Sequence, residues 1–515
     1  MTAPSPADLD HQVRHGTRTV LAAQIAAQIV SLVVLAIMMR LVAPAEYGLL
    51  GMVLPVVMLP RMATTLGLST AVLQRKLSAE QLTSLFWLNV TGGLVAAALT
   101  ALGGVWLAQV YSQPILGPVG LALAGATIIA ALGNQHQALL ERRLKFAPLA
   151  AVRLLSLVAG GIAGIQTARR GGGIWALVAQ QYGELAVLTL WVWLIEPWRP
   201  GWPRRSASVA GLIRFSGFYS VSQLVYFVAQ NLDKVLLPAL VGPAADRWVG
   251  LYSQAFNFFM KPVYLLTAPL TGVMVAGLSQ AVSREERTAL ASRFFRLVAM
   301  GLFPCAAGLL VTASDVMLVL GGPAWRASGW VLAALAPALL TQGLVNAGGH
   351  VLASAGKSGR LLFAMLVLTL LLTQASLVGF FLGREHLTGE VGSPASGGML
   401  GIALGYTAVL LVVWGPAYLW FCLRSADLPP RPVLLPLWRP LLAALAMGLA
   451  VFALRQLPVL AAWTPAARLS ALVIAGMLVY AFFARGELRW LAGELVSPRL
   501  AKSPQRVDGS SSPPT

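Results

Sequence analysis

The feature that most constrains this chain is a series of apolar segments, each about as long as a membrane is thick. A helix needs about 20 predominantly apolar residues to cross a bilayer. Fourteen segments come close to that length, at residues 17–39, 48–72, 84–108, 115–140, 147–168, 173–195, 210–238, 250–279, 290–313, 327–353, 361–383, 398–423, 436–456 and 466–484. Only 11% of the 515 residues are charged, whereas soluble domains carry about 25%. The sequence therefore predicts an all-α polytopic membrane protein with about 14 transmembrane helices.

Lysine and arginine are distributed unevenly between the loops. If the N-terminus is cytoplasmic, the inside segments hold 26 of these residues, the outside segments hold 8, and 3 lie within spans, which accounts for all 37. Positive residues favour the cytoplasmic side of a membrane, so we expect both termini in the cytoplasm. The same topology explains the net charge of +19 without a nucleic acid partner.

A short stretch occurs twice in the chain. Residues 41–50 read Leu-Val-Ala-Pro-Ala-Glu-Tyr-Gly-Leu-Leu, and residues 240–252 read Leu-Val-Gly-Pro-Ala-Ala-Asp-Arg-Trp-Val-Gly-Leu-Tyr. Each copy follows one apolar segment and opens the next, which indicates two similar halves. Six spans per half is an even number, so the halves run parallel. We expect a cytoplasmic tail at 1–16, an N-lobe of spans 1–6 at 17–200, a C-lobe of spans 7–12 at 201–425, spans 13–14 at 426–485, and a partly disordered cytoplasmic tail at 486–515.

Each copy opens a span that carries one basic residue beside a proline. The pairs are Pro60-Arg61 in the first half and Lys261-Pro262 in the second. Ionisable residues within spans are costly and tend to be functional. Because the placement is duplicated, we favour an anion site in a cavity that both halves share. The structural alternative is that Arg61 pairs with a neighbouring carboxylate such as Glu184.

Polar residues follow one face of several spans. In span 7 they recur at spacings of four and three from Tyr219 to Asp233, which places them on one helical face. Such a face lines either a cavity or a helix interface, because lipid does not solvate it. The candidate cavity-lining residues are Gln24, Gln28, Tyr219, Gln223, Tyr226, Gln230 and Asn257. Two embedded acids, Glu184 and Asp233, are candidates for coupling to a proton or Na⁺, and Asp233 alternatively pairs with Lys234 or Arg247.

Other patterns restrict the class of protein. Gly397, Gly401 and Gly405, at a spacing of four, indicate a close helix-packing seam. No phosphate-binding loop motif is evident, so ATP coupling within the chain is not expected. Cys305 and Cys422 form no metal-ligand pattern, and we expect no metal and no cofactor.

The order of several short stretches resembles one branch of a transporter superfamily. These are Arg40–Gly48, Gly67–Lys76, Leu85–Asn89, Gly173–Val178, Asn231–Asp233 and Gly250–Ser253. Together they resemble the polysaccharide-transport family of the multidrug/oligosaccharidyl-lipid/polysaccharide flippase superfamily, which includes the Wzx-type exporters of lipid-linked oligosaccharides. They cover the first half and the start of the second, and spans 9 to 14 match only in hydropathy.

The resemblance implies a fold and a substrate. The fold has two six-helix lobes around a central cavity, usually with two further helices, and works by alternating access. The substrate is an undecaprenyl-diphosphate-linked glycan, which moves from the cytoplasmic to the periplasmic leaflet of the bacterial inner membrane for lipopolysaccharide, capsule or exopolysaccharide biosynthesis. Arg61 and Lys261 are the positions where we place the diphosphate. A glycan polymerase and chain-length machinery are candidate partners.

Two other functions are weighed against this one. A cation-coupled multidrug antiporter of the same superfamily typically has twelve spans and an acidic cavity, which the basic pair disfavours. A glycan polymerase or ligase needs a large periplasmic loop with catalytic residues, and the longest outside loop, at about 384–397, has 14 residues. We therefore expect a transporter rather than an enzyme.

Overall fold

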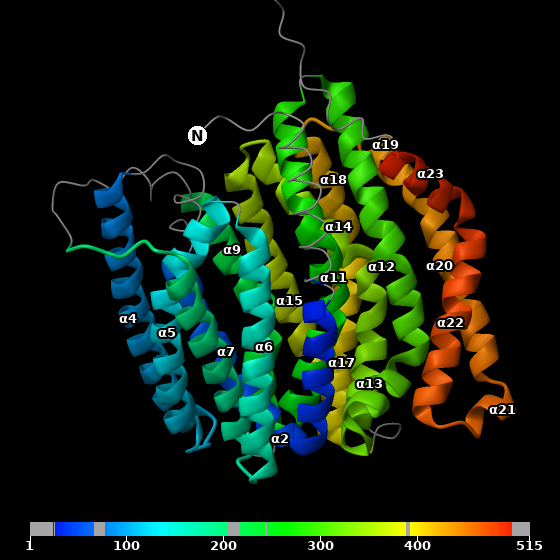
Figure 1. Ribbon diagram of the computed structural model, residues 1–515. Helices are drawn as coiled ribbons and strands as arrows, with labels where there is room; N and C mark the ends of the chain where they lie inside the picture. Colours follow the sequence, from blue (N-terminus) through cyan, green and yellow to red (C-terminus); the bar gives the residue numbers. More distant parts are fainter. Residues whose placement is uncertain are drawn as a thin grey trace, which may run out of the picture.

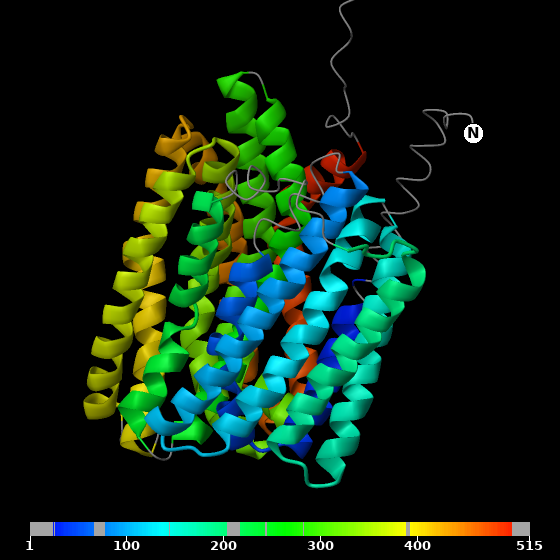
Figure 2. The same cartoon turned by 90° about the vertical axis from the view of Figure 1, so that its left-hand side faces the viewer.

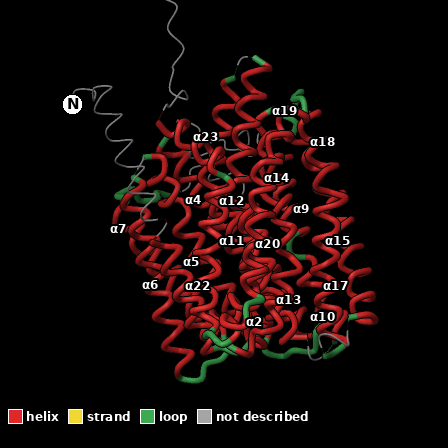
Figure 3. The backbone as a smooth tube through the Cα atoms, turned by 90° about the vertical axis from the view of Figure 1, so that its right-hand side faces the viewer, coloured by secondary structure: helices red, strands yellow, loops and turns green. Residues whose placement is uncertain are grey.

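The chain folds into upright helices that lie side by side (Figure 1). A computed structural model describes residues 24, 26–65, 78–143, 145–202, 217–242, 245–281, 283–387 and 392–496. Over these ranges the elements are helices joined by loops, with no strand (Figure 3). The all-α polytopic class predicted from the sequence is therefore confirmed.

The N-lobe holds the helix Ala26–Leu41 and five longer helices. These are α2 (Pro44–Thr65), α4 (Ala79–Val110), α5 (Leu116–Arg142), α6 (Phe146–Arg169) and α7 (Ile174–Ile195). The C-lobe begins with α9 (Gly217–Ala229), α10 (Leu232–Val241), α11 (Ala245–Gln280) and α12 (Arg284–Gly321). It continues with η1 (Pro323–Trp325), α13 (Arg326–Leu335), η2 (Ala336–Ala338), α14 (Leu339–Ser354), α15 (Ser358–His386), α17 (Pro394–Ala408), the π-helical η3 (Val409–Trp414) and α18 (Gly415–Ser425).

The remaining helices form a separate group beside the C-lobe. They are α19 (Pro430–Leu434), η4 (Leu435–Leu437), α20 (Trp438–Arg455), α21 (Pro458–Ala461), α22 (Pro465–Phe483) and α23 (Arg485–Val496). In Figure 1 they stand at the edge of the molecule, in orange and red, against α12. This is the position expected for two helices added after a pair of six-helix lobes.

The number of spans in the described residues is eleven, or twelve if a helix pair with a 45° bend within α11 is one span. Two further helices stand where spans 1 and 6 were expected. Ala26–Leu41 is shorter than a span within the described residues, and α7 has 22 residues but includes polar Gln180, Gln181 and Glu184. The fold is thus the expected one, while the count of fourteen stays a prediction.

The helices of the two lobes pack in the same pattern. In the N-lobe α2 contacts α4, α4 contacts α5 and α6 contacts α7. In the C-lobe the equivalent pairs are α11 with α12, α12 with α13 and α15 with α17. The main contact between lobes is α2 against α11, the two helices that the duplicated stretch opens. Figure 2 shows the blue-to-teal N-lobe with the yellow α15–α17 pair beside it, at the left of the picture. The exact lobe boundaries stay predictions.

Glycines bring α15 and α17 into close contact. A Cβ atom added at Gly401 would lie 1.9 Å from the Gly379 carbonyl oxygen, and one at Gly383 would lie 2.2 Å from the Gly397 carbonyl oxygen. Backbone therefore meets backbone, which only glycine permits at these distances. The seam predicted from the glycine spacing is confirmed.

Ion pairs hold the added helices against α12 at both ends. The buried Asp315 carboxylate of α12 accepts hydrogen bonds from Arg468 of α22, at 3.0 Å from Nε, and lies 3.4 Å from Arg455 Nη2 of α20. At the opposite end, Arg296 of α12 pairs with Glu487 of α23. Ion pairs thus join this group to α12 near both ends of that helix.

Candidate functional site

The two copies of the duplicated stretch pack against each other where α2 and α11 begin. A Cβ atom at Gly48 would lie 1.6 Å from the Asp246 carbonyl oxygen, and one at Gly250 would lie 1.8 Å from the Pro44 carbonyl oxygen. Gly48 therefore contacts Asp246, four residues before Gly250, and Gly250 contacts Pro44, four residues before Gly48. This reciprocity is what a two-fold relation between the lobes produces. Only glycine permits the helices to approach so closely.

Hydrogen bonds between the lobes surround this glycine crossing. The indole of Trp325 is buried and donates to the Met39 carbonyl at 2.8 Å. Arg40 Nη2 donates to the Val319 carbonyl at 2.7 Å, and the Tyr111 hydroxyl donates to the Val235 carbonyl at 2.9 Å. The crossing and these bonds join the lobes at the end that the charge bias places outside. We call this set of contacts the outer seal.

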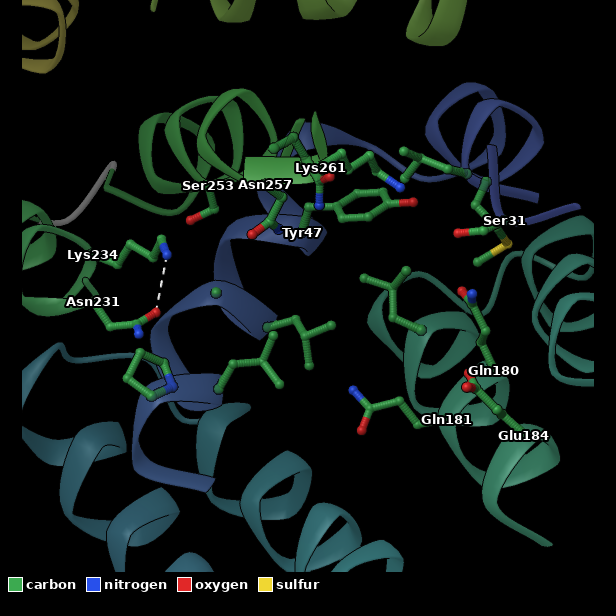
Figure 4. Close-up of a pocket in the computed structure, with 18 residues that line it drawn as sticks. Ser31, Tyr47, Gln180, Gln181, Glu184, Asn231, Lys234, Ser253, Asn257 and Lys261 are labelled. Atoms are coloured by element: carbon green, nitrogen blue, oxygen red, sulfur yellow. Dashed lines mark hydrogen bonds between the residues drawn. The ribbon is translucent and has the colours of Figure 1, made fainter. Parts of the chain in front are cut away.

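A cavity of about 320 Å³ lies between the lobes next to the outer seal. Figure 4 shows the polar side chains of α10 and α11 on one side and those of α7 on the other. The polar lining residues are Ser31, Tyr47, Gln180, Gln181, Glu184, Asn231, Lys234, Ser253, Gln254, Asn257 and Lys261. We call it the interlobe cavity.

Two lysines of the C-lobe line the interlobe cavity. Lys261 of α11 makes no hydrogen bond or ion pair with any residue that the structure describes. Lys234 of α10 is buried, and its ammonium donates to Asn231 Oδ1 at 3.0 Å and lies 4.2 Å from the centre of the Phe256 ring. Asp233 also interacts electrostatically with the Lys234 charge, and Glu184 lines the same cavity. Of the two ammonium groups, that of Lys261 therefore lacks a counter-charge among the described residues.

Arg61, the equivalent of Lys261 in the first half, has a different surrounding. It interacts electrostatically with Glu184, and Glu184 rather than Arg61 is among the described residues that line the cavity. The structural alternative weighed from the sequence, a charge pair between these two residues, is therefore present. The role of Arg61 as a diphosphate ligand stays a prediction.

Asp233 is held by partners that the sequence did not indicate. One carboxylate oxygen accepts from the Tyr252 hydroxyl at 2.5 Å, and the other accepts from the backbone N–H of Lys234 at 2.8 Å. The Asp233 and Lys234 charges interact electrostatically without an ion-pair contact, so the local pair weighed from the sequence is present with Lys234, while no described ion pair joins Asp233 to Arg247. Its proposed part in ion coupling, like that of Glu184, stays a prediction.

The polar stripe of span 7 divides between two environments. Gln230 and Tyr226 belong to a buried network in which the Tyr226 hydroxyl donates to Asn346 at 2.7 Å and accepts from Gln230 and Gln342. The Tyr406 hydroxyl closes the network by donating to Gln342 at 2.9 Å. Gln223 and Tyr226 also line a second cavity within the C-lobe. The stripe thus faces both a helix interface and a cavity.

Of the other residues predicted to line the cavity, one lies in its described lining. Asn257 lines the interlobe cavity, whereas Gln24 and Gln28 are half-buried and do not belong to its described lining. Tyr219 lies in the first turn of α9, and its side chain falls outside the described residues.

Sequence reasoning missed several contributors to the cavity. Lys234 was noted within a span but was interpreted only as a partner of Asp233. Gln180 and Gln181 were not singled out, although they interrupt an otherwise apolar span four and three residues before Glu184. That interruption was the available signal.

Comparisons with known proteins agree with this architecture. Lipopolysaccharide biosynthesis protein WzxC of Escherichia coli K12 is 24% identical over 429 residues, which cover 82% of this chain and 83% of that protein. Succinoglycan biosynthesis transport protein ExoT of Rhizobium meliloti is 27% identical over 428 residues, which cover 81% of each.

Two solved structures have a similar fold. The lipid II flippase MurJ in an inward closed conformation gives a TM-score of 0.67 at 14% identity, covering 92% of this chain and 99% of that chain. An inward-facing multidrug resistance MATE family transporter of the MOP superfamily gives 0.57 at 12% identity, covering 77% and 94%. The sequence profile of the family described as "Polysaccharide biosynthesis protein" matches residues 37–329, more than half of the chain. The chain is therefore a multi-pass membrane protein that belongs to the polysaccharide biosynthesis protein family.

Proposed function

We propose that the protein is a flippase that moves an undecaprenyl-diphosphate-linked oligosaccharide from the cytoplasmic to the periplasmic leaflet of the bacterial inner membrane. The glycan serves lipopolysaccharide, capsule or exopolysaccharide biosynthesis. The names of WzxC and ExoT, which refer to lipopolysaccharide biosynthesis and succinoglycan transport, support this assignment. We propose that both termini are cytoplasmic, as the charge bias predicts.

The observation that carries the proposal is the pair of lysines in the interlobe cavity. Lys234 and Lys261 line a space between two lobes within the membrane. Among the described residues Lys261 forms no ion pair, and the counter-charge of Lys234 is the neighbouring Asp233. A charge in such a place is costly and needs a counter-charge. A diphosphate supplies at least two negative charges. At a separation of about 4 Å and an effective dielectric constant of about 20, one such contact is worth about 4 kcal/mol, compared with about 1 kcal/mol in water.

An apolar groove next to the cavity suits the lipid chain. Phe258 and Pro262 of α11, one residue beyond Asn257 and Lys261, line a groove of about 410 Å³ with α12, α20 and α22. The opposing wall includes Met447 and Leu472. A polyprenyl chain in this groove would leave its diphosphate on the cavity side of α11. This arrangement gives the added helices a part in binding.

Transport requires that the outer seal open. The glycine crossing joins the lobes beside the interlobe cavity, at the end that the charge bias predicts to be periplasmic. We propose alternating access, in which the lobes separate at the crossing and release the glycan to the periplasm. The predicted lobe boundaries, at about 200 and 425, mark the units that move.

The proposal is tested by deleting the gene and measuring where lipid-linked oligosaccharide gathers. We expect the substrate to accumulate on the cytoplasmic leaflet, and wild-type protein to restore export. A variant with Lys234→Ala and Lys261→Ala, expressed at the same level, should fail to restore it. Normal export in the deletion strain would contradict the proposal.

One observation favours a second function. Glu184 lines the cavity, and a carboxylate suits a cationic substrate, as in a cation-coupled multidrug antiporter. The two functions differ in what the deletion strain accumulates. Sensitivity to cationic drugs with no accumulated lipid-linked glycan would support the antiporter.

A further inference from the structure

A second cavity, of about 400 Å³, lies within the C-lobe. Its polar lining includes Gln223, Tyr226, Tyr264, Asn346, His350 and Tyr418, from α9, α11, α14 and α18. It shares no described lining residue with the interlobe cavity. None of the described residues that line it is Asp, Glu, Lys or Arg. We call it the C-lobe pocket.

Some polar groups of the C-lobe pocket lack hydrogen-bond partners among the described residues. The Tyr418 side chain is 1% exposed, and its hydroxyl makes no hydrogen bond with them. The side chains of Gln223, which is half-buried, and of Tyr264, which is exposed, also make none. Leaving a buried group such as the Tyr418 hydroxyl unpaired costs about 1–3 kcal/mol, and such a group needs an explanation. Tyr226 and Asn346, by contrast, hydrogen-bond to each other at 2.7 Å.

The C-lobe pocket follows the interlobe cavity along α11. Lys261 lines the interlobe cavity, and Tyr264 lines the C-lobe pocket three residues later. Three residues advance an α-helix by about 4.5 Å. A group attached to a diphosphate held by Lys261 is therefore near this pocket.

We infer that the C-lobe pocket is a subsite for a neutral sugar residue of the lipid-linked glycan. This inference rests on the proposed function. A sugar offers hydroxyls that both donate and accept hydrogen bonds, together with apolar C–H faces. The pocket offers the matching groups, which are an amide, unpaired tyrosine hydroxyls and aromatic rings. Its lack of charged lining residues disfavours an ionic ligand, since a buried ion needs a counter-charge.

The Tyr418 hydroxyl allows a clean test. Because it bonds to no described residue, Tyr418→Phe should leave the midpoint temperature of unfolding unchanged or raise it. Gln223→Leu removes the unpaired amide in the same way. The matched control is Tyr182→Phe in the N-lobe, where the lost hydroxyl donates to the Ala122 carbonyl at 2.5 Å. That control should lower stability and leave sugar binding unchanged.

The measurement is equilibrium binding to protein in lipid nanodiscs. The probes are undecaprenyl diphosphate and the same lipid carrying glucose, galactose or N-acetylglucosamine. We expect at least one glycosylated lipid to bind more tightly than the bare lipid. Tyr418→Phe and Gln223→Leu should each reduce that advantage about 2- to 12-fold, the range for one hydrogen bond, without changing the affinity for the bare lipid.

Two results overturn the inference, and they differ in what they say of the proposed function. If the bare lipid binds but no glycosylated lipid binds more tightly, or if neither variant reduces the advantage, the sugar subsite is wrong and the flippase proposal stands. If the wild-type protein binds neither the bare nor the glycosylated lipids, the flippase proposal fails together with the subsite.

Discussion

Gly48→Ala should open the outer seal. The added Cβ atom would lie 1.6 Å from the Asp246 carbonyl oxygen. Separations under 3.0 Å are essentially never seen for a real Cβ, so α2 and α11 must move apart by about 1.4 Å. Overpacking costs about 1–3 kcal/mol, and a clash with backbone belongs at the upper end because no side chain can rotate away. A cost at that upper end, about 3 kcal/mol confined to the sealed state, shifts the population about 150-fold towards the outward-open state.

The shift is measured by thiol labelling. A single cysteine is placed at Gln181, which lines the interlobe cavity, in a chain whose Cys305 and Cys422 are replaced by alanine. An impermeant reagent added from outside should label it slowly in the parent and much faster after Gly48→Ala.

Two other glycines provide graded controls. A Cβ atom at Gly51 would meet the Ser253 Oγ at 2.9 Å, a side-chain atom that can rotate, and one at Gly117 would meet nothing within 4 Å. The labelling rate should therefore rise in the order Gly117→Ala, Gly51→Ala, Gly48→Ala. Equal rates in all three, at equal amounts of inserted protein, would refute the assignment of the crossing as a seal.

Three further predictions concern charged groups. Arg61→Ala should impair export, because the Glu184 charge in the cavity is no longer neutralised. If that is the role of Arg61, adding Glu184→Gln should restore export. Failure of the double variant to export would instead indicate that Arg61 binds the substrate directly. Asp315→Asn should destabilise the purified protein by about 2 kcal/mol, the range for a hydrogen bond to a charged group, because the carboxylate that binds Arg455 and Arg468 is lost. Thermal unfolding checks this against the exposed Glu285→Gln. The hydrogen bond from Lys357 at 2.9 Å lowers the pKa of Asp427. The contribution of Asp427 to folding stability is therefore fully present above the unfolded pKa of about 3.9 and is lost as pH falls through the lower folded pKa. The difference in unfolding temperature between wild type and Asp427→Asn should accordingly begin to shrink below about pH 4 and vanish once the pH is below the folded pKa.

The architecture could be predicted from the sequence because the length of an apolar segment indicates a membrane span and a repeated motif indicates similar halves. The Gly397, Gly401 and Gly405 spacing likewise predicted the α15–α17 seam, since small residues four apart form one helix face. The duplicated stretch indicated two similar halves around a shared site. It did not indicate that its two copies contact each other; that reciprocal backbone contact through Gly48 and Gly250 needed the spatial arrangement of α2 and α11.

The site was less accessible because cavities form from side chains of several helices. Lys234 follows Asp233 in sequence, which suggested a local ion pair. In the structure Asp233 turns to Tyr252 and the Lys234 ammonium faces the cavity. Periodicity placed Gln230 and Tyr226 on one helical face. It could not show that their hydrogen bonds are satisfied within the protein, because the partners Gln342 and Asn346 lie more than a hundred residues away in the sequence.

The most direct test of the account is the affinity of the purified protein for undecaprenyl diphosphate. Lys234→Ala and Lys261→Ala should each weaken binding about tenfold or more, as expected for hydrogen bonds to charged groups. The double variant should lose less than the sum in free energy, because both lysines act on one ligand group. Lys357→Ala, which removes a lysine outside the cavity, should bind as wild type does. Unchanged affinity in both single variants and in the double variant would contradict the claim that this cavity holds the diphosphate.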